Sequence, residues 1–215
     1  MNALLILMKT LSRVTLILLL NLTLFFSQSQ AQNAPSIHDV KGLIPGDTVH
    51  FFTAKEADGS FFHLEEALEQ GPVVVIFYRG QWCPYCNRHL SNLQDSLGML
   101  MSAGARLIAI SPEQPEYLDK MKQKTGAQFT LLYDSAYRIS QQFDVLYAPD
   151  KKQVKRFGRV AKEDLEKIHG SEHALLPVPA TFIIDKNGII VWRQFDTNQK
   201  KRSDVQSILM HLPKD

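Results

Sequence analysis

The chain has 215 residues, of which 45% are hydrophobic, and this is enough to bury one core of ordinary size. It carries 24 basic and 22 acidic residues, a formal charge of +2, with the two signs interspersed. Because no basic stripe results, the composition argues against a nucleic-acid partner.

The first 31 residues have the layout of a secretory signal peptide. Lys9 and Arg13 precede an apolar run over 14–26, and small residues follow it. Ser29 and Ala31 fit the −3 and −1 positions, which predicts cleavage after Ala31 and export to the periplasm or the medium. The run is about 13 residues long, short of the roughly 20 that span a bilayer. We therefore expect no stable membrane insertion after cleavage, with an uncleaved anchor as the alternative.

A single domain is predicted over 48–215, after a linker. Residues 32–47 are polar and rich in proline and glycine, which is typical of a linker. Two expected strands, 49–54 and 60–63, flank Asp58-Gly59, which favours a hairpin turn. The domain is therefore expected to begin with a β-hairpin.

The middle of the chain alternates between strand and helix patterns. Two runs without polar alternation, 73–78 and 106–110, are typical of strands buried on both faces of a sheet. Leu90, Leu93, Leu97, Leu100 and Met101 recur at helical spacing and predict one amphipathic helix. The remaining expected elements are helices at 64–70, 115–125, 136–143 and 204–212 and strands at 129–133, 181–185 and 189–195. This order predicts an α/β fold with a mixed central sheet and helices on both faces.

The segment 149–173 does not fit that alternation. It is densely charged, and a helix is expected from about 161 to 169. The simplest interpretation is a charged insertion that forms a solvated surface excursion, and the alternative is a docking or dimer surface.

Both cysteines of the chain lie in one motif, Cys83-Pro84-Tyr85-Cys86. A disulfide that closes only two intervening residues removes little chain entropy, so a purely structural bridge is disfavoured even in an oxidising compartment. The motif joins a buried strand to a helix, which is a redox placement. Pro84 suits the first helical position and makes Cys83 the N-cap, where the free amides and the helix dipole favour a thiolate. This predicts Cys83 as the nucleophile and Cys86 as the resolving cysteine.

The motif fits haem attachment and metal binding less well than redox chemistry. Attachment of c-type haem requires histidine directly after the second cysteine, where Asn87 stands. Cys83, Cys86 and His89 supply three metal ligands, fewer than a closed zinc site requires, although copper(I) accepts fewer soft ligands. His89 is expected to serve in packing or at the surface. We expect no metal and no cofactor, and a copper-binding protein stays the non-enzyme alternative.

With these residues in view, the chain resembles the peroxiredoxin-like branch of the alkyl hydroperoxide reductase/thiol-specific antioxidant (AhpC/TSA) superfamily from about Gly46 to Phe195. The resemblance rests on the stretches DGSFFHLEEAL, VVVIFYRGQWCPYC, RLIAISPE, QQFDV and PVPATFIIDKNGIIVW. It implies a thioredoxin-like fold with an N-terminal hairpin. It also implies a thiol-based antioxidant enzyme that reduces hydroperoxides, with electrons from a thioredoxin-like dithiol donor and a Cys83/Cys86 pair cycling between dithiol and disulfide.

The chain departs from the family pattern at three positions. By register, Arg79 stands in the slot of the family's proline, Cys83 in that of its threonine, and Cys86 in that of its peroxidatic cysteine. The resemblance therefore assigns the attack to Cys86, whereas the helix-cap argument assigns it to Cys83. Pro179 occupies the slot of the family's peroxide-polarising arginine, and it also matches the cis-proline that faces the cysteines in thioredoxins.

The supporting residues leave two enzymatic functions open. Arg79 or Arg88 is a candidate for the positive group that polarises a peroxide, Trp82 for a hydrophobic lid on the sulfurs, and Tyr85 for an exposed residue that tunes access. The Cys-x-x-Cys motif, the Pro179 slot and the missing arginine favour thiol–disulfide exchange with protein disulfides as the alternative substrate. The sequence predicts no oligomeric state.

Overall fold

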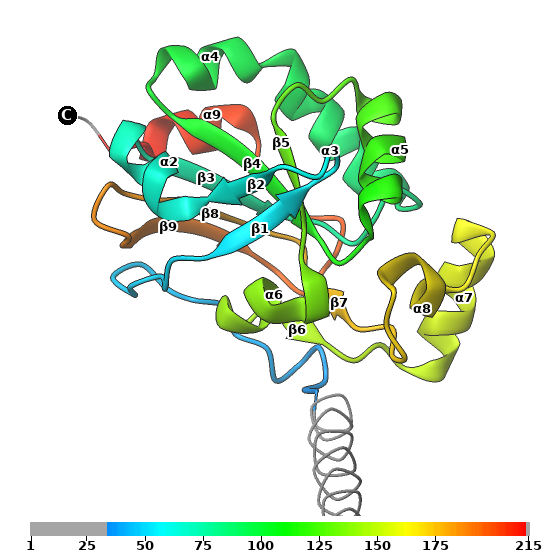
Figure 1. Cartoon of the computed structure of the whole chain (residues 1–215). Coiled ribbons are helices and arrows are strands. Elements are labelled where there is room, and N and C mark those ends of the chain that lie inside the picture. Colours follow the sequence, from blue (N-terminus) through cyan, green and yellow to red (C-terminus); the bar gives the residue numbers. More distant parts are fainter. Residues whose placement is uncertain (1–33, 214–215) are drawn as a thin grey trace, which may run out of the picture. The chain divides into compact units, whose positions relative to one another are not determined.

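Seven strands form the central sheet (Figure 1), in the order β2-β1-β5-β4-β3-β8-β9. The computed structural model describes residues 34–213. The strands are β1 (Thr53–Glu56), β2 (Phe61–His63), β3 (Val73–Phe77), β4 (Arg106–Ser111), β5 (Thr130–Tyr133), β8 (Ala180–Ile184) and β9 (Ile190–Phe195). Strands β3, β4 and β5 are parallel, and the other pairs in the sheet are antiparallel. The predicted mixed sheet is therefore confirmed.

Helices cover both faces of this sheet. The helices of the described residues are α2 (Leu64–Gln70), α3 (Pro84–Asp95), α4 (Leu97–Ser102), α5 (Pro115–Thr125), α6 (Arg138–Gln142), α7 (Lys151–Ala161), α8 (Leu165–His169) and α9 (Val205–His211), with a 3₁₀ turn, η1 (Ser135–Tyr137). Of these, α7 and α8 lie beside the sheet (Figure 1). A short separate sheet pairs β6 (Leu146–Tyr147) with β7 (Leu176–Pro177).

Strand β3 separates two apolar cores because its side chains alternate between the faces of the sheet. Val74 and Ile76 pack in one cluster with residues of α3, α4, α5 and α9. Val73, Val75 and Phe77 pack in the other with residues of α2 and α6. All five side chains are buried, as expected for a strand covered on both faces. The chain that leaves β3 is consequently held firmly at the edge of the sheet where Tyr78 begins the loop to α3.

The expected single helix from Leu90 to Met101 is wrong. The structure divides it into α3 and α4, with Ser96 between them outside helical geometry. Ser96 and Gly98 are weak helix formers in a helix interior, which explains the break. Met101 lies at the surface, whereas Leu90 is buried in the core.

The segment predicted as a linker packs against the domain from residue 35 onward. Val40 is buried, and the backbone N–H of Gly42 donates to the carbonyl of Asp144 at 2.9 Å. Nη1 of Arg193 donates to all three carbonyls of residues 41–43. The segment satisfies its polar backbone through such contacts with residues distant in sequence, which local composition does not reveal.

The charged insertion forms a helix where none was expected. Helix α7 precedes the predicted range, begins at a capping box between Asp150 and Gln153, and ends where Lys162 adopts left-handed geometry. The predicted helix from about 161 to 169 is shortened to α8. Because Phe157 and Ile168 are buried, the insertion is more than a solvated excursion.

The predicted signal peptide over 1–31 lies outside the described residues and stays a prediction. Over 34–213 the structure contains no helix of the length and apolar character that a membrane crossing requires.

Phe143 provides a test of the second core. Its ring is fully buried and lies 5.0 Å from the ring of Phe77 and 5.2 Å from that of Phe182, measured between centroids. Phe143→Ala is expected to lower the free energy of unfolding by about 3–5 kcal/mol, because it removes the ring and leaves a cavity. Urea unfolding measures the change. Phe61→Ala, at a side chain that is 62% exposed, is the matched control with an expected loss of about 1 kcal/mol or less.

Candidate active site

The two cysteines lie at the carboxyl edge of the parallel strands. Cys83 follows the loop after β3 and occupies the N-cap of α3 with extended backbone geometry, and Pro84 takes the first helical position. The predicted cap geometry is thus present. The backbone N–H of Cys86, in the first turn of α3, contributes to the lowered pKa of the Cys83 thiol, in the direction that the sequence predicts.

Both sulfurs are shielded from solvent. The two residues are free cysteines, with Cys83 0% and Cys86 1% exposed. They belong to the same apolar cluster as Trp82, Phe157 and Val178. Tyr85, in contrast, is 36% exposed and lies at the surface as expected. Any reactant must therefore pass this cover before it reaches a sulfur.

Arg79 is the positive group beside the cysteines. Its side chain is only 3% exposed, and its Nη2 donates to Cys83 Sγ at 3.1 Å. The guanidinium carbon lies 5.3 Å from the ring centroid of Trp82 and 4.8 Å from that of Phe157. Within the described residues, its buried Nε and Nη1 have no hydrogen-bond partner. Arg88 is exposed instead, so of the two candidate arginines only Arg79 is placed at the sulfur.

The environments of the two thiols shift their pKa values in opposite directions. A hydrogen bond from the Cys86 thiol, together with the charge of Arg79, lowers the pKa of Cys83 to about 5 against the opposing effect of burial. Burial raises the pKa of Cys86, and the hydrogen bond to Cys83 raises it further. At neutral pH the pair therefore holds one thiolate, on Cys83, and one thiol, on Cys86.

A buried carboxyl group that the sequence analysis did not single out supports the loop before Cys83. Glu113 is fully buried, and its Oε2 accepts a hydrogen bond from the backbone N–H of Gln81 at 2.8 Å. Burial raises the pKa of Glu113 well above its ordinary value. Gly80 lies against the same carboxyl with φ +154, and a side chain there would collide with Glu113 and Trp82. The placement of Glu113 just after β4, at the carboxyl edge of the parallel strands, was the available sequence signal.

Phe157 is the second site residue that the sequence analysis missed. It is the buried residue of α7, and its ring lies 5.2 Å from that of Trp82, centroid to centroid. Trp82 therefore covers the sulfurs together with an aromatic ring from the charged insertion. The available signal was the helical spacing of Val154, Phe157 and Ala161 in the basic stretch KKQVKRFGRVA.

Pro179 does not have the expected backbone geometry. It is buried between β7 and β8, and the described part of the chain contains no cis peptide bond. The predicted cis-proline is therefore wrong. The neighbouring Val178 N–H is not free for a substrate, since it donates to the carbonyl of Val145 at 2.7 Å. The backbone directly before Pro179 is therefore engaged within the fold.

His89 serves in packing, as expected. It is buried, and its Nε2 lies 3.0 Å from the carbonyl oxygen of Ser203. Burial lowers the pKa of His89 to about 4, so the ring is neutral at pH 7. Among residues 34–213, the structure contains no group of three or more histidine, cysteine, aspartate or glutamate residues arranged to hold a metal ion.

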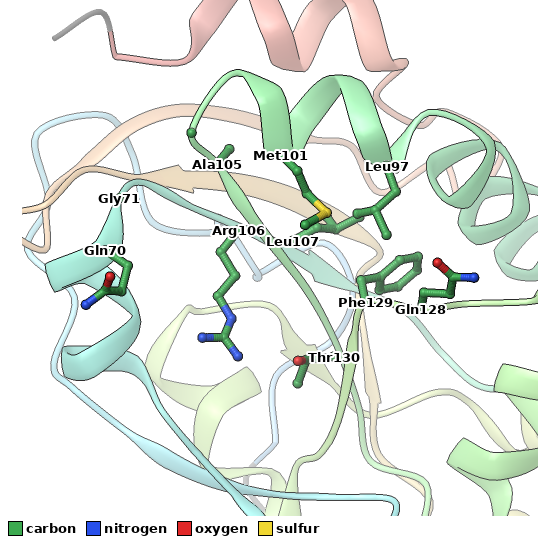
Figure 2. A pocket seen from close by; sticks show the side chains of 11 residues that line it. Gln70, Gly71, Leu97, Met101, Ala105, Arg106, Leu107, Gln128, Phe129 and Thr130 are labelled. Carbon is green, nitrogen blue, oxygen red and sulfur yellow. The ribbon is translucent and has the colours of Figure 1, made fainter.

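Two surface cavities lie at different distances from the cysteine motif, one remote from it and one beside the helix that carries it. One, of about 450 Å³ (Figure 2), is lined by Arg106 and Leu107 at the start of β4 and by Phe129 and Thr130 at β5. It lies at the opposite edge of the parallel strands from Cys83 and does not belong to the site. The other, of about 400 Å³, lies beside α3, with Tyr85, Arg88 and His89 on one side and residues 200–205 on the other.

Comparison with known proteins shows the family of this chain. The model of the AhpC/TSA family matches residues 45–193. The chain belongs to the AhpC/TSA family. This confirms the resemblance drawn from the sequence and, with it, the expected class of thiol peroxidases.

Several curated relatives of this chain are peroxiredoxins. The chain is 28% identical over 156 residues to a putative peroxiredoxin of Mycobacterium tuberculosis, covering 72% of this chain and 86% of that protein. It is 32% identical over 103 residues to peroxiredoxin Bcp of Escherichia coli, covering 48% of this chain and 65% of that protein.

Solved structures of peroxiredoxins share the fold. Peroxidoxin BcpB of Mycobacterium tuberculosis aligns with a TM-score of 0.57 at 22% identity, covering 70% of this chain and 84% of that one. A cysteine variant of PrxQ from Xylella fastidiosa aligns with a TM-score of 0.61 at 16% identity, covering 79% and 95%. At these identities the likeness supports the thioredoxin-like fold alone.

Arg79→Met tests the origin of the Cys83 thiolate. Loss of the adjacent positive charge is expected to shift the thiolate titration midpoint upward, from about 5 toward the roughly 8.5 of an ordinary thiol. Ultraviolet thiolate absorbance of the reduced protein, followed against pH, measures the midpoint. Arg88→Met removes the same charge from an exposed position on α3 and is expected to leave it unchanged. An equal midpoint in all three proteins contradicts the assignment.

Phe157→Ala tests the cover over the sulfurs. Removal of the ring opens a path to Cys83, so the plateau rate of its alkylation by iodoacetamide is expected to rise several-fold. Val160→Ala, at an exposed position on the same helix, is the control with an unchanged rate. Thermal melting of both variants checks that the fold persists. A Phe157→Ala rate equal to that of the wild type shows that access is limited elsewhere.

Proposed function

We propose that the protein reduces hydroperoxides by attack of the Cys83 thiolate on the peroxide oxygen. The observation that carries the proposal is the guanidinium of Arg79. One of its N–H groups contacts the reactive sulfur, and the buried Nε and Nη1 beside it have no partner among residues 34–213. Unpaired buried donors next to a thiolate suit a substrate oxygen on which negative charge develops. Arg79 is thereby a candidate replacement for the family arginine whose slot Pro179 occupies.

The first half of the cycle follows from the two thiol environments. The Cys83 thiolate attacks the terminal oxygen of the hydroperoxide, an S–O bond forms and the O–O bond breaks. The leaving alkoxide takes up a proton and departs as an alcohol, or as water if the substrate is hydrogen peroxide. The Cys86 thiol then attacks the sulfur of the resulting sulfenic acid, which forms the Cys83–Cys86 disulfide and releases water.

The second half requires an external dithiol. Two electrons from the donor reduce the disulfide to two thiols, and the donor becomes a disulfide. Membership of the AhpC/TSA family supports a thioredoxin-like donor. The burial of both sulfurs favours a small hydroperoxide as the oxidant over a protein disulfide, because a protein reaches Cys83 only after the cover of Trp82 and Phe157 has been displaced. Exchange with protein disulfides stays the alternative.

Cys83→Ser and Cys86→Ser distinguish the mechanisms. We expect Cys83→Ser to abolish consumption of cumene hydroperoxide with dithiothreitol as donor. Cys86→Ser is expected to complete one stoichiometric turnover and leave a sulfenic acid that dimedone traps. Mass spectrometry locates the dimedone adduct, and the wild type with and without peroxide is the control.

Other outcomes point to the alternatives. A sulfenic acid that forms on Cys86 in the Cys83→Ser variant assigns the attack to Cys86, as the family register does. Reduction of insulin disulfides without any peroxide turnover, lost in Cys83→Ser, replaces the peroxidase proposal with thiol–disulfide exchange.

A further inference from the structure

The exposed charged residues of helix α7 and its C-cap are all basic. Between residues 151 and 162 the chain has no acidic residue. Six basic side chains of this stretch are exposed: Lys151, Lys152, Lys155, Arg156, Arg159 and Lys162. No salt bridge links any of them to an acid within the described part of the chain. We call these six residues the α7 basic face.

The flanking acids are engaged elsewhere. Asp150 uses its carboxylate to cap the helix by accepting the Gln153 N–H at 2.7 Å. Glu163 pairs with Lys167 at 2.7 Å between Nζ and Oε1. The cations of the α7 basic face are therefore not neutralised by the acids nearest to them in sequence.

The distribution of these charges is unfavourable for the helix itself. Lys151 and Lys152 lie in the first turn, where no acidic residue stands. The positive end of the helix dipole favours acidic side chains at that position, so two lysines there oppose it. Basic residues that oppose the helix dipole, and so do not stabilise the helix, are typical of a functional surface.

The α7 basic face lies directly outside the reactive sulfurs. Phe157 is the buried residue of α7, and the centroid of its ring lies 4.8 Å from the guanidinium carbon of Arg79. That guanidinium contacts Cys83 Sγ at 3.1 Å. Figure 1 shows α7 and α8 together beside the sheet, outside the helices that cover its two faces. The helix that carries the α7 basic face therefore also carries Phe157, one of the two rings that cover Cys83.

We propose that the α7 basic face is the docking surface for the reducing partner, a dithiol protein with acidic residues around its reactive cysteines. The inference rests on the proposed function, since it assumes that a donor reduces the Cys83–Cys86 disulfide. Complementary charge steers the donor to the helix that carries Phe157, and contact there displaces the ring. The donor's thiolate then attacks one sulfur of the disulfide, which releases the other as a thiolate. The donor's second thiol displaces the mixed disulfide, so the donor leaves oxidised and both cysteines are reduced.

Two matched dithiol peptides test the surface without knowledge of the natural donor. Both carry the same Cys-Gly-Pro-Cys core, one flanked by glutamates and the other by lysines. At low ionic strength, the wild type is expected to reduce peroxide with the glutamate peptide at a kcat/KM roughly tenfold or more above that with the lysine peptide. Lys151→Glu/Lys155→Glu/Arg159→Glu reverses the charge of three residues at helical spacing, and it is expected to reverse this preference. Salt is expected to weaken the preference in both proteins.

The controls separate this inference from the proposed function. With dithiothreitol, which is uncharged at neutral pH, both proteins are expected to turn over peroxide equally. Lys41→Glu/Lys55→Glu/Lys122→Glu makes the same charge change at exposed positions on other elements and is expected to keep the wild-type preference. Absence of peroxide turnover with dithiothreitol in the wild type defeats the proposed function.

Normal turnover with dithiothreitol but no peptide preference, or a preference that survives charge reversal on α7, overturns the docking surface alone. Binding of the wild type, but not the α7 variant, to phosphatidylglycerol vesicles without any peptide preference also overturns it, in favour of a membrane contact.

Discussion

The contact between a buried guanidinium and a buried thiolate is the interaction on which the rest of the site depends. Placing either charge alone among Trp82, Phe157 and Val178 is unfavourable, because an apolar environment cannot replace water around an ion. Arg79 and Cys83 compensate each other at 3.1 Å, and the Cys86 thiol adds a hydrogen bond to the same sulfur. The same burial that raises the pKa of Cys86 strengthens the attraction between Arg79 and Cys83. One apolar environment therefore gives the two cysteines opposite protonation states.

The loop that positions this contact is only six residues long, from Tyr78 to Cys83. Strand β3, buried on both faces, ends at Phe77, and α3 begins at Pro84. Between them, Gln81 is held by the buried carboxyl of Glu113, which follows the neighbouring strand β4. Lys124 of α5 donates to the carbonyl oxygen of Gln81 from the other side at 3.1 Å. The loop that carries Arg79 and Cys83 is thus fastened to two further elements, which limits the positions available to the guanidinium.

The departures from the AhpC/TSA pattern form a consistent set. Arg79 replaces a proline and Cys83 replaces a threonine in the same loop, and these two side chains contact each other. By register, Pro179 stands in the slot of the family arginine, while Arg79 supplies a guanidinium beside Cys83. The second cysteine needed to close a disulfide is one helical turn away, so the chain carries both redox partners on one element. The charged insertion completes the arrangement, because its Phe157 closes the site and its basic residues face outward.

The sequence alone determined the elements whose signals are local. The β-branched run at 73–77, the helix over 115–125 and the N-cap at Cys83 follow from side-chain type and spacing over a few residues. Only the tertiary structure decided the contacts between distant segments. These are the packing of residues 35–47 on the domain, the burial of Glu113 under the loop and the position of Phe157 over Arg79. The physical reason is that burial and charge pairing depend on neighbours in space. A glutamate after a strand and a phenylalanine in a basic helix have no distinctive sequence signal until the fold brings them to the sulfur.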